Sequence, residues 1–340
     1  MSTIDPNLPL IDLHRHLDGN VRLETIIDLG RKHDLPLPAW DVAGLRPHVQ
    51  VTASAEGDGS MPGVMAFISK FEWMMRVLVD YDACYRVAYE NVEDARREGM
   101  DYVELRFSPW FMAESHGLDP AGVVDAVVEG VAAGARAFGQ RVNLIGILSR
   151  TYGVDTAWKE LEALLHRRDA IVGLDLAGDE ANWPGELFVE HLRRARDAGW
   201  HPTVHAGEAD GAASIWQALR DLGAERIGHA VAAADDPALM DYMVEHAVGV
   251  EANLTSNVQT RTVPDYARHP ARIFLERGML VTLNTDDPGI SGIDLRYEYE
   301  VAAPAAGLSP DQIRQAQRNA LTVAFLPDEE KRALVAVKAG

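Results

Sequence analysis

The chain has 340 residues, and 32 Lys and Arg stand against 52 Asp and Glu, which gives a formal net charge of −20. This excess of acidic side chains argues against nucleic acids and anionic membranes as partners, because both are bound by clustered basic residues. With 47% hydrophobic and 25% charged residues, the composition is that of a folded globular protein rather than a disordered one.

Eight short runs of β-branched and apolar residues punctuate the sequence, and each run ends in polar or glycine-containing residues. Longer amphipathic segments separate these runs, a pattern typical of strands that alternate with helices. Strands that are apolar along nearly their whole length indicate a parallel sheet covered by helices. The predicted strands are residues 10–13, 102–107, 142–148, 171–176, 201–205, 226–229, 248–254 and 280–284.

From the second strand onward, the pattern repeats at intervals of roughly 25 to 40 residues, about one strand-helix unit of a (β/α)8 barrel. We therefore predict an α/β fold, a (β/α)8 TIM barrel, with residues 1–340 forming a single domain. The predicted helices are residues 83–97, 122–138, 157–167, 184–198, 211–222, 237–246 and 270–277, followed by closing C-terminal helices at 309–325 and 328–338.

The first interval is too long for one such unit, because about 90 residues separate the first two strands. It contains helical patterns at 19–33 and 64–79 on either side of a turn-rich segment, 53–63. We expect extra helices inserted over about residues 19–98, beside the barrel mouth. The turn-rich segment could act as a lid, and a solvated loop without a role is an equally good interpretation.

Polar residues at the predicted strand ends are candidates for a site, because barrel enzymes place catalytic groups at the carboxyl ends of their strands. His14 and His16 follow the first strand, and alternate residues of an extended chain face the same side. A lone His-x-His pair is more often a surface or core feature than a metal site. Its position at a strand end favours the metal interpretation.

Three further strand ends carry residues of the same kind. The fifth run ends at His205, which Glu208 follows, the sixth ends at His229, and Asp286 and Asp287 follow the eighth. Each alone has an ordinary explanation as a core histidine, a turn or a helix cap. Together they predict a site of imidazoles and carboxylate that suits a divalent ion, Zn2+ first, although other transition metals fit as well.

Residue counts narrow the chemistry further. A single cysteine, Cys84, excludes an intrachain disulfide and a thiolate metal cluster. No lysine stands at the end of the fourth strand, so a single ion is favoured over a bridged pair. Such an ion lowers the pKa of a bound water molecule, and Glu208 and His229 would remain as acid and base. The sequence lacks glycine-rich phosphate-binding motifs and a nucleophile elbow.

Five motifs stand in order along the sequence: HRHLDG at 14–19, DLAGDE at 175–180, HAGE at 205–208, GH at 228–229 and NTDDP at 284–288. Together they resemble the adenosine deaminase family, in particular its bacterial members, and the match covers nearly the whole chain. The resemblance implies a zinc-dependent barrel that converts adenosine or 2′-deoxyadenosine and water to the corresponding inosine and ammonia, in purine salvage.

The resemblance also implies a role for each matching residue. Glu208 would donate a proton to purine N1, while His229 would position the attacking water and take up its proton. Asp287 would contact purine N7 and the incoming hydroxide. The ligands of one zinc ion per chain would be His14, His16, His205 and Asp286.

Other matching residues would bind the substrate. Asp18 would contact the ribose 5′-hydroxyl, Gly178 would bind purine N3 through its backbone N–H, and His16 would lie beside the substrate. Relatives that act on free adenine have glutamate at the position of Asp18, which argues against adenine but leaves a modified adenosine open as an alternative. Ala230 stands where a glycine is expected after the catalytic histidine, and we expect this to change local packing only.

A third interpretation is a non-catalytic nucleoside-binding barrel, since a fold does not determine a function. The presence of both Glu208 and His229 speaks against it. Residues 1–9 have no apolar run of signal-peptide length, and no uncharged apolar stretch is long enough to span a bilayer. We therefore expect a cytoplasmic monomer or weak homo-oligomer that takes a neutral purine nucleoside and water.

Overall fold

In the computed structural model, which describes residues 3–51 and 67–339, the strands form one parallel eight-stranded sheet in sequential order. Each predicted apolar run overlaps one of these strands, so the predicted (β/α)8 barrel is confirmed. The strands are β1 (Ile11–His16), β2 (Tyr102–Phe107), β3 (Arg141–Ser149), β4 (Ile171–Ala177), β5 (His201–Ala206), β6 (Arg226–His229), β7 (Gly249–Ala252) and β8 (Leu280–Leu283).

The first and last strands meet just beyond the end of β8. The backbone N–H of His16 donates to the carbonyl of Asp286 at 2.8 Å, and the N–H of Asp286 donates to the carbonyl of His14 at 2.8 Å. A parallel bridge pairs Arg15 with Asp286 at the same place. The seam of the barrel is therefore made by residues that the sequence marks as candidates for the site.

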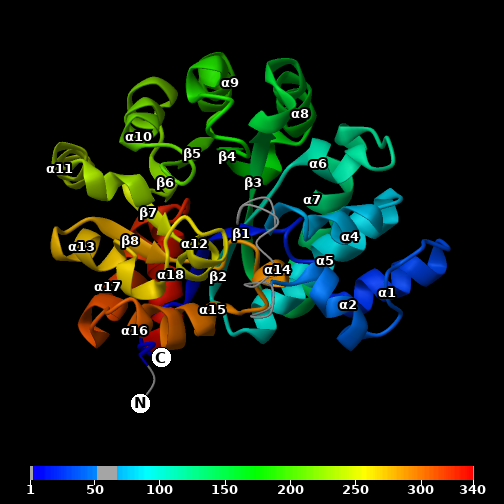
Figure 1. Ribbon diagram of the computed structural model, residues 1–340, viewed down its shortest axis with the longest axis horizontal. Coiled ribbons are helices and arrows are strands. Elements are labelled where there is room, and N and C mark those ends of the chain that lie inside the picture. The colour runs from blue at the N-terminus through cyan, green and yellow to red at the C-terminus, as the bar shows by residue number, and fades with distance from the viewer. Residues whose placement is uncertain (1–2, 52–66, 340) are drawn as a thin grey trace.

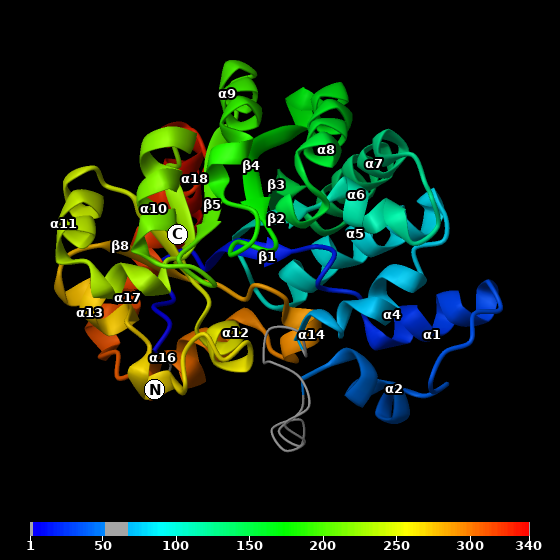
Figure 2. The same ribbon diagram turned by 45° about the horizontal axis from the view of Figure 1, so that its top comes forward.

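Helices surround the barrel, as Figures 1 and 2 show. The helix α7 (Pro120–Phe138) illustrates their local signals: the Asp119 side chain accepts the N–H of Ala121 at its start, and Gly139 ends it at φ 65°. No helix of the described residues is long and apolar enough to cross a membrane. The other outer helices are α8 (Val154–His166), α9 (Val189–Asp197), α10 (Ala212–Gln217), α11 (Pro237–Glu245), α13 (Ala271–Glu276), α17 (Pro310–Val323) and α18 (Asp328–Ala339).

Extra helices lie between β1 and β2, as the sequence predicts. In Figure 1 they extend to one side of the barrel. The possible lid at 53–63 lies outside the described residues and stays a prediction, as does the assignment of the whole chain to one domain. The inserted helices are α1 (Leu23–Lys32), α2 (Val42–Val49), α4 (Phe71–Arg76) and α5 (Tyr81–Arg97).

Several short helices were not predicted, because three to eight residues are too few to show a helical period. Local capping explains some of them: the hydroxyl of Ser108 accepts the N–H of Phe111 at the start of α6. Two predicted helices are also less regular than expected, since 184–198 begins as a 3-10 turn and 211–222 ends in a π-type turn. The unpredicted helices are α2, α6 (Pro109–Glu114), α12 (Leu254–Gln259), α14 (Pro288–Ser291), α15 (Leu295–Tyr297) and α16 (Ala303–Ala305).

A chain of buried charges of alternating sign crosses the barrel interior. Glu104 on β2 pairs with Arg226 on β6 at 2.5 Å, and Arg226 pairs with Glu251 on β7 at 2.7 Å. Glu251 pairs with Arg106 on β2 at 2.9 Å, and Arg106 pairs with Asp175 on β4 at 2.8 Å. Burial raises the pKa of Glu251, but Arg106 and Arg226 outweigh burial and hold this pKa well below its usual value. We call these five residues the core charge chain.

Replacement of one cation of the core charge chain should destabilise the fold strongly. Arg226→Leu leaves Glu104 and Glu251 buried without this partner, and breaking a buried pair costs about 3–5 kcal/mol in free energy of unfolding. Urea unfolding followed by circular dichroism measures the loss. Arg193→Leu is the control, because Arg193 forms its ion pairs on the surface and its loss should change little. Equal stability of the two variants would contradict the importance of the chain.

Candidate active site

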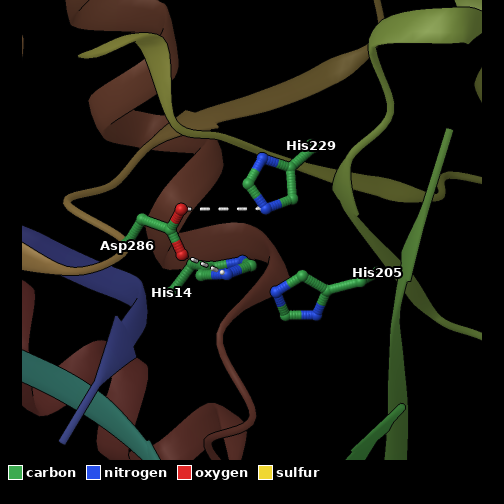
Figure 3. Close-up of side chains that lie close together, drawn as sticks. All are labelled: His14, His205, His229 and Asp286. Carbon is green, nitrogen blue, oxygen red and sulfur yellow. Dashed lines mark ion pairs between the residues drawn. The ribbon is translucent and has the colours of Figure 1, made fainter. Parts of the chain in front are cut away.

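Four side chains from distant parts of the sequence converge at the carboxyl end of the strands (Figure 3). His14 lies on β1, His205 on β5 and His229 on β6, and Asp286 follows β8. One potential ligand atom of each lies within 4.8 Å of those of the other three, and all four residues are buried. The structure therefore brings together predicted residues from four strand ends.

His16 joins this cluster from the side of the barrel mouth, where its side chain is 12% exposed. Its Nε2 atom lies 3.4 Å from Oδ1 of Asp286 and 3.4 Å from Nε2 of His205. Its Nδ1 atom lies 3.6 Å from Oδ1 of Asp18. His16, Asp286 and Asp287 also form a second group whose potential ligand atoms lie within 4.8 Å of one another.

Two carboxylates of the core charge chain, Glu251 and Asp175, each contact a histidine of the cluster. Nδ1 of His14 lies 2.7 Å from Glu251, and Nδ1 of His205 lies 2.9 Å from Asp175. A carboxylate requires a donor, so each Nδ1 carries the hydrogen and each Nε2 offers a lone pair to the cluster. Nε2 of His14 is buried and has no hydrogen-bond partner among the described residues. Such a lone pair fits a metal ion.

The electrostatics of the cluster also suit a cation. Burial lowers the pKa of His205 to about 3, which keeps this ring neutral. Burial also opposes the charged form of His16, but neighbouring carboxylates, with Asp287 first, raise its pKa to about 9. Burial raises the pKa of Asp286, yet His229 and the other imidazoles hold it well below its usual value. The neutral imidazole of His205 and the ionised carboxylate of Asp286 are donors that divalent transition metals prefer, whereas His16 would have to give up a proton on binding such an ion.

Glu208 lies beside the cluster, with its Oε2 atom 3.5 Å from Nε2 of His229. Its side chain is 22% exposed, and burial raises its pKa. The loop that carries it is held by the carboxylate of Glu180, which accepts the backbone N–H groups of four successive residues, 207 to 210, at 2.6, 3.1, 2.8 and 3.2 Å. Glu180 thereby determines where Glu208 lies.

A cavity of about 220 Å³ opens beside His16 and is lined by Asp18, Ser108, Phe111 and Gly178, among others. One carboxylate oxygen of Asp18 accepts the N–H of Ser108 at 3.0 Å. The other is buried and has no hydrogen-bond partner among the described residues, so it is available to a ligand. The cavity is therefore lined by apolar side chains together with a few specific polar groups, as small-molecule sites are.

Glycine is required at Gly178, which lines this cavity, and at Gly19, which packs against Asp287. Gly178 has φ 105°, and a Cβ there would lie 2.5 Å from Oγ1 of Thr151. A Cβ at Gly19 would lie 1.7 Å from Oδ1 of Asp287, so any side chain would displace that carboxylate. Both glycines belong to motifs that the sequence analysis selected.

A larger cavity, of about 560 Å³, lies at the opposite end of the strands, among residues such as His201, Arg226 and Lys331. None of the predicted site residues lines it. The smaller cavity is therefore the better candidate for substrate, because it adjoins the histidine cluster.

The structure corrects the expectation for Ala230. This residue has φ 55°, directly after His229 at φ 64°, and both lie in the left-handed region. A glycine would adopt this conformation without strain, whereas an L residue pays about 1–2 kcal/mol. The substitution therefore acts on the backbone rather than on packing. Asp286 has φ 61° as well, so three strained residues lie at the cluster.

The sequence analysis did not identify the residues that orient the histidines and the loop of Glu208. Asp175 and Glu180 fell within a selected motif but received no role, and Arg106 and Glu251 lay inside apolar runs. A charged residue in the middle of a buried strand was the available signal, because such a charge requires a partner. The identity of that partner depends on the tertiary structure.

Known proteins resemble this chain in both sequence and fold. A family model described as adenosine deaminase matches residues 9–337. A protein named adenosine deaminase from Edwardsiella ictaluri is 59% identical over 331 residues, which cover 97% of this chain and 98% of that protein.

Two solved structures share the fold at 26% sequence identity. One is an adenine deaminase from Arthrobacter aurescens, with a TM-score of 0.87 and 98% of each chain covered. The other is an amidohydrolase from Burkholderia ambifaria with bound Zn, with a TM-score of 0.85, 98% of this chain and 90% of that chain covered.

Glu180→Gln should loosen the loop at residues 207–210. The amide retains one acceptor oxygen and turns its NH2 group toward backbone donors, and an unmet buried N–H costs about 1–3 kcal/mol. Hydrogen exchange of these four amides should accelerate roughly 10-fold or more. Mass spectrometry of peptides from this loop measures the rate. Glu186→Gln, an exposed neighbour, is the control, and equal exchange in both variants would refute this role for Glu180.

Proposed function

This chain belongs to the adenosine deaminase family, and from this premise we infer how its site works. It is a hydrolytic deaminase, which converts adenosine and water to inosine and ammonia. We propose that it also accepts 2′-deoxyadenosine and that it serves purine salvage. The observation that carries the mechanism is the convergence of four histidines and two aspartates beside a cavity that polar and apolar residues line together.

The proposed metal centre is one zinc ion per chain. His14 and His16 turn Nε2 toward Asp286, and Nε2 of His205 faces Nε2 of His16. In all three residues Nδ1 lies near a carboxylate, of Glu251, Asp18 or Asp175 respectively. His229 differs, because its Nδ1 lies 2.9 Å from the amide nitrogen of Asn257. This difference supports the ligand set His14, His16, His205 and Asp286. When bound, the ion would lower the pKa of a water molecule at the site.

The proposed acid is Glu208. Addition of water oxygen at purine C6 moves electrons onto N1, so a proton donor at N1 stabilises the product of this addition. A carboxyl group can donate only if it is protonated, and burial raises the pKa of Glu208 in that direction. Glu180 holds the loop, so the acid keeps one orientation.

The remaining residues would bind and orient the reactants. His229 lies between Glu208 and Asp286 and would position the attacking water. Asp287 would contact purine N7 and the incoming hydroxide. Asp18 has an unpartnered buried oxygen in the cavity for the ribose 5′-hydroxyl, and Gly178 would bind purine N3 through its N–H. His16 would lie against the substrate as well as the metal.

The charge of the protein bears on its partners. A net charge of −20 disfavours phosphorylated nucleotides and nucleic acids, so a neutral nucleoside is the proposed substrate. Free adenine is a second candidate, because an adenine deaminase shares the fold, but an aspartate at position 18 suits a ribose hydroxyl. We place the enzyme in the cytoplasm, as a monomer or weak homo-oligomer.

Metal removal tests the proposed centre. Purified protein should deaminate adenosine, lose activity on chelation and recover it when zinc returns, all followed by ultraviolet absorbance; free adenine in parallel measures specificity. His205→Ala and Asp286→Ala should lower the zinc content well below one ion per chain. His166→Ala, whose side chain is 63% exposed, is the control. Full activity after metal removal would refute the metal centre.

Glu208→Gln tests the proposed acid. The amide has nearly the same shape but cannot give up a proton readily, so kcat for adenosine should fall roughly 10²-fold or more. Zinc content and nucleoside affinity should remain, as measured by metal analysis and calorimetry. Asp210→Asn, an exposed carboxylate in the same loop, should leave kcat nearly unchanged. Normal turnover by the Glu208 variant would remove this residue from the mechanism.

A further inference from the structure

Three hydrogen-bonded contacts extend from His229 away from the cluster. Nδ1 of His229 lies 2.9 Å from Nδ2 of Asn257, on α12, and Oδ1 of Asn257 lies 3.1 Å from Nε2 of His269. Nδ1 of His269 accepts the backbone N–H of Ala271 at 3.1 Å. Asn257 is 0% exposed and His269 is 3% exposed, so water does not compete for these contacts. The proposed function uses only the first of these contacts, to distinguish His229 from the metal ligands, and gives Asn257 and His269 no role of their own.

The donor and acceptor of each hydrogen bond in this series can be assigned from its last contact, between His269 and Ala271. A backbone N–H can only donate, so Nδ1 of His269 must offer a lone pair to Ala271. Burial lowers the pKa of His269 to about 3, so the ring is neutral and its hydrogen lies on Nε2. That N–H donates to the amide oxygen of Asn257. The NH2 group of Asn257 consequently faces His229 and donates to its Nδ1 atom.

The surroundings of His229 agree with this direction. A ring whose Nδ1 accepts a hydrogen bond carries its hydrogen on Nε2. That atom faces two acceptors, Oε2 of Glu208 at 3.5 Å and Oδ2 of Asp286 at 3.8 Å. The amide nitrogen of Asn253 lies 3.4 Å from each of the two ring nitrogens and therefore favours neither.

We propose that Asn257 and His269 are positioning residues that fix His229 in the tautomer with hydrogen on Nε2. His229 then presents a hydrogen-bond donor to the cluster, whereas His14 and His205 present lone pairs. The N–H group of His229 can donate to a lone pair on the oxygen of the attacking water. Because this N–H has no lone pair of its own, it does not compete for the metal. This inference rests on the proposed function. Nε2 of His229 already carries a hydrogen, so it cannot take up the proton of the water, and that proton would pass instead to Asp287, the carboxylate proposed to contact the incoming hydroxide.

Nitrogen-15 NMR of the zinc-loaded full-length protein, labelled at histidine, tests the tautomer directly. His229→Gln identifies the resonances of His229 by their loss. We expect Nδ1 without hydrogen and Nε2 with hydrogen. Hydrogen on Nδ1 of His229, whether in the other neutral tautomer or in the cation, would overturn the proposal. The spectrum reports the tautomer whatever the substrate is, so a failure of the proposed function would be seen separately, as absence of adenosine turnover.

Asn257→Asp tests the consequence for catalysis. Its carboxylate has two acceptor oxygens, so the one facing His229 requires hydrogen on Nδ1 and should reverse the tautomer. We expect kcat for adenosine to fall roughly 10²-fold, with KM and zinc content close to those of the parent. Asn319→Asp is the matched control, because Asn319 is a buried amide on α17 that donates to the carbonyl of Val281. A reversed tautomer with unchanged kcat would overturn the proposal.

Variants of His269 test the far end of the series and remain informative if Asn257→Asp does not fold. His269→Gln retains an N–H donor that can reach Asn257, whereas His269→Leu has a similar volume and no donor. We expect His269→Gln to retain most of kcat, and His269→Leu to lose roughly 10-fold or more with little change in KM. Thermal unfolding of both variants separates this effect from a loss of stability. Equal kcat values for two folded variants would contradict the positioning role.

Discussion

The ion pairs of Arg106 are the interaction on which both the barrel and its site depend. This guanidinium lies between Asp175 and Glu251, and each of these carboxylates in turn holds Nδ1 of a histidine in the cluster. Five charges buried in one interior would be costly if any were alone, but their alternating sign gives each a partner. Burial raises the pKa of both carboxylates, but His205 and Arg106 outweigh burial at Asp175, and Arg106 and Arg226 outweigh it at Glu251. These ionised carboxylates set the hydrogen positions of His14 and His205. The ion pairs that stabilise the barrel interior therefore also orient two of the proposed metal ligands.

The seam of the barrel imposes a second constraint on the site. The backbone of Asp286 pairs with β1 and closes the sheet, while its carboxylate lies in the histidine cluster. The position of the carboxylate is therefore set by the closure of the barrel. Its left-handed backbone, and those of His229 and Ala230, carry strain that the adjoining strands must support. The consecutive strained pair His229 and Ala230, at the end of β6, turns the chain away from the strand at the position where His229 meets its partners. Conformations of this kind persist where neighbouring structure holds the backbone in place, as the parallel ladders on both sides of β6 do here.

The barrel and the gathering of its polar residues were predictable from local pattern. Apolar runs such as 102–107 and 226–229 coincide with β2 and β6, and a parallel barrel necessarily brings the carboxyl ends of its strands together. His14, His205 and Asp286 could therefore be selected from strand ends alone. The roles of Arg106, Glu180 and Asn257 could not, because each depends on a partner far away in the sequence. The short helix α12, which carries Asn257, was also too short to show a helical period, so nothing in its sequence distinguished this amide from a surface residue.

The two kinds of histidine in this cluster differ only in what lies behind them. His14 and His205 have a carboxylate at Nδ1, which accepts, and His229 has an amide NH2 group, which donates. An acceptor behind the ring turns a lone pair toward the cluster, and a donor behind the ring turns an N–H toward it. A metal ion needs the first arrangement and an oriented water molecule needs the second. A site built from identical imidazoles can thus contain both ligands and donors, and the distinction is made by Glu251, Asp175 and Asn257, none of which faces the substrate cavity.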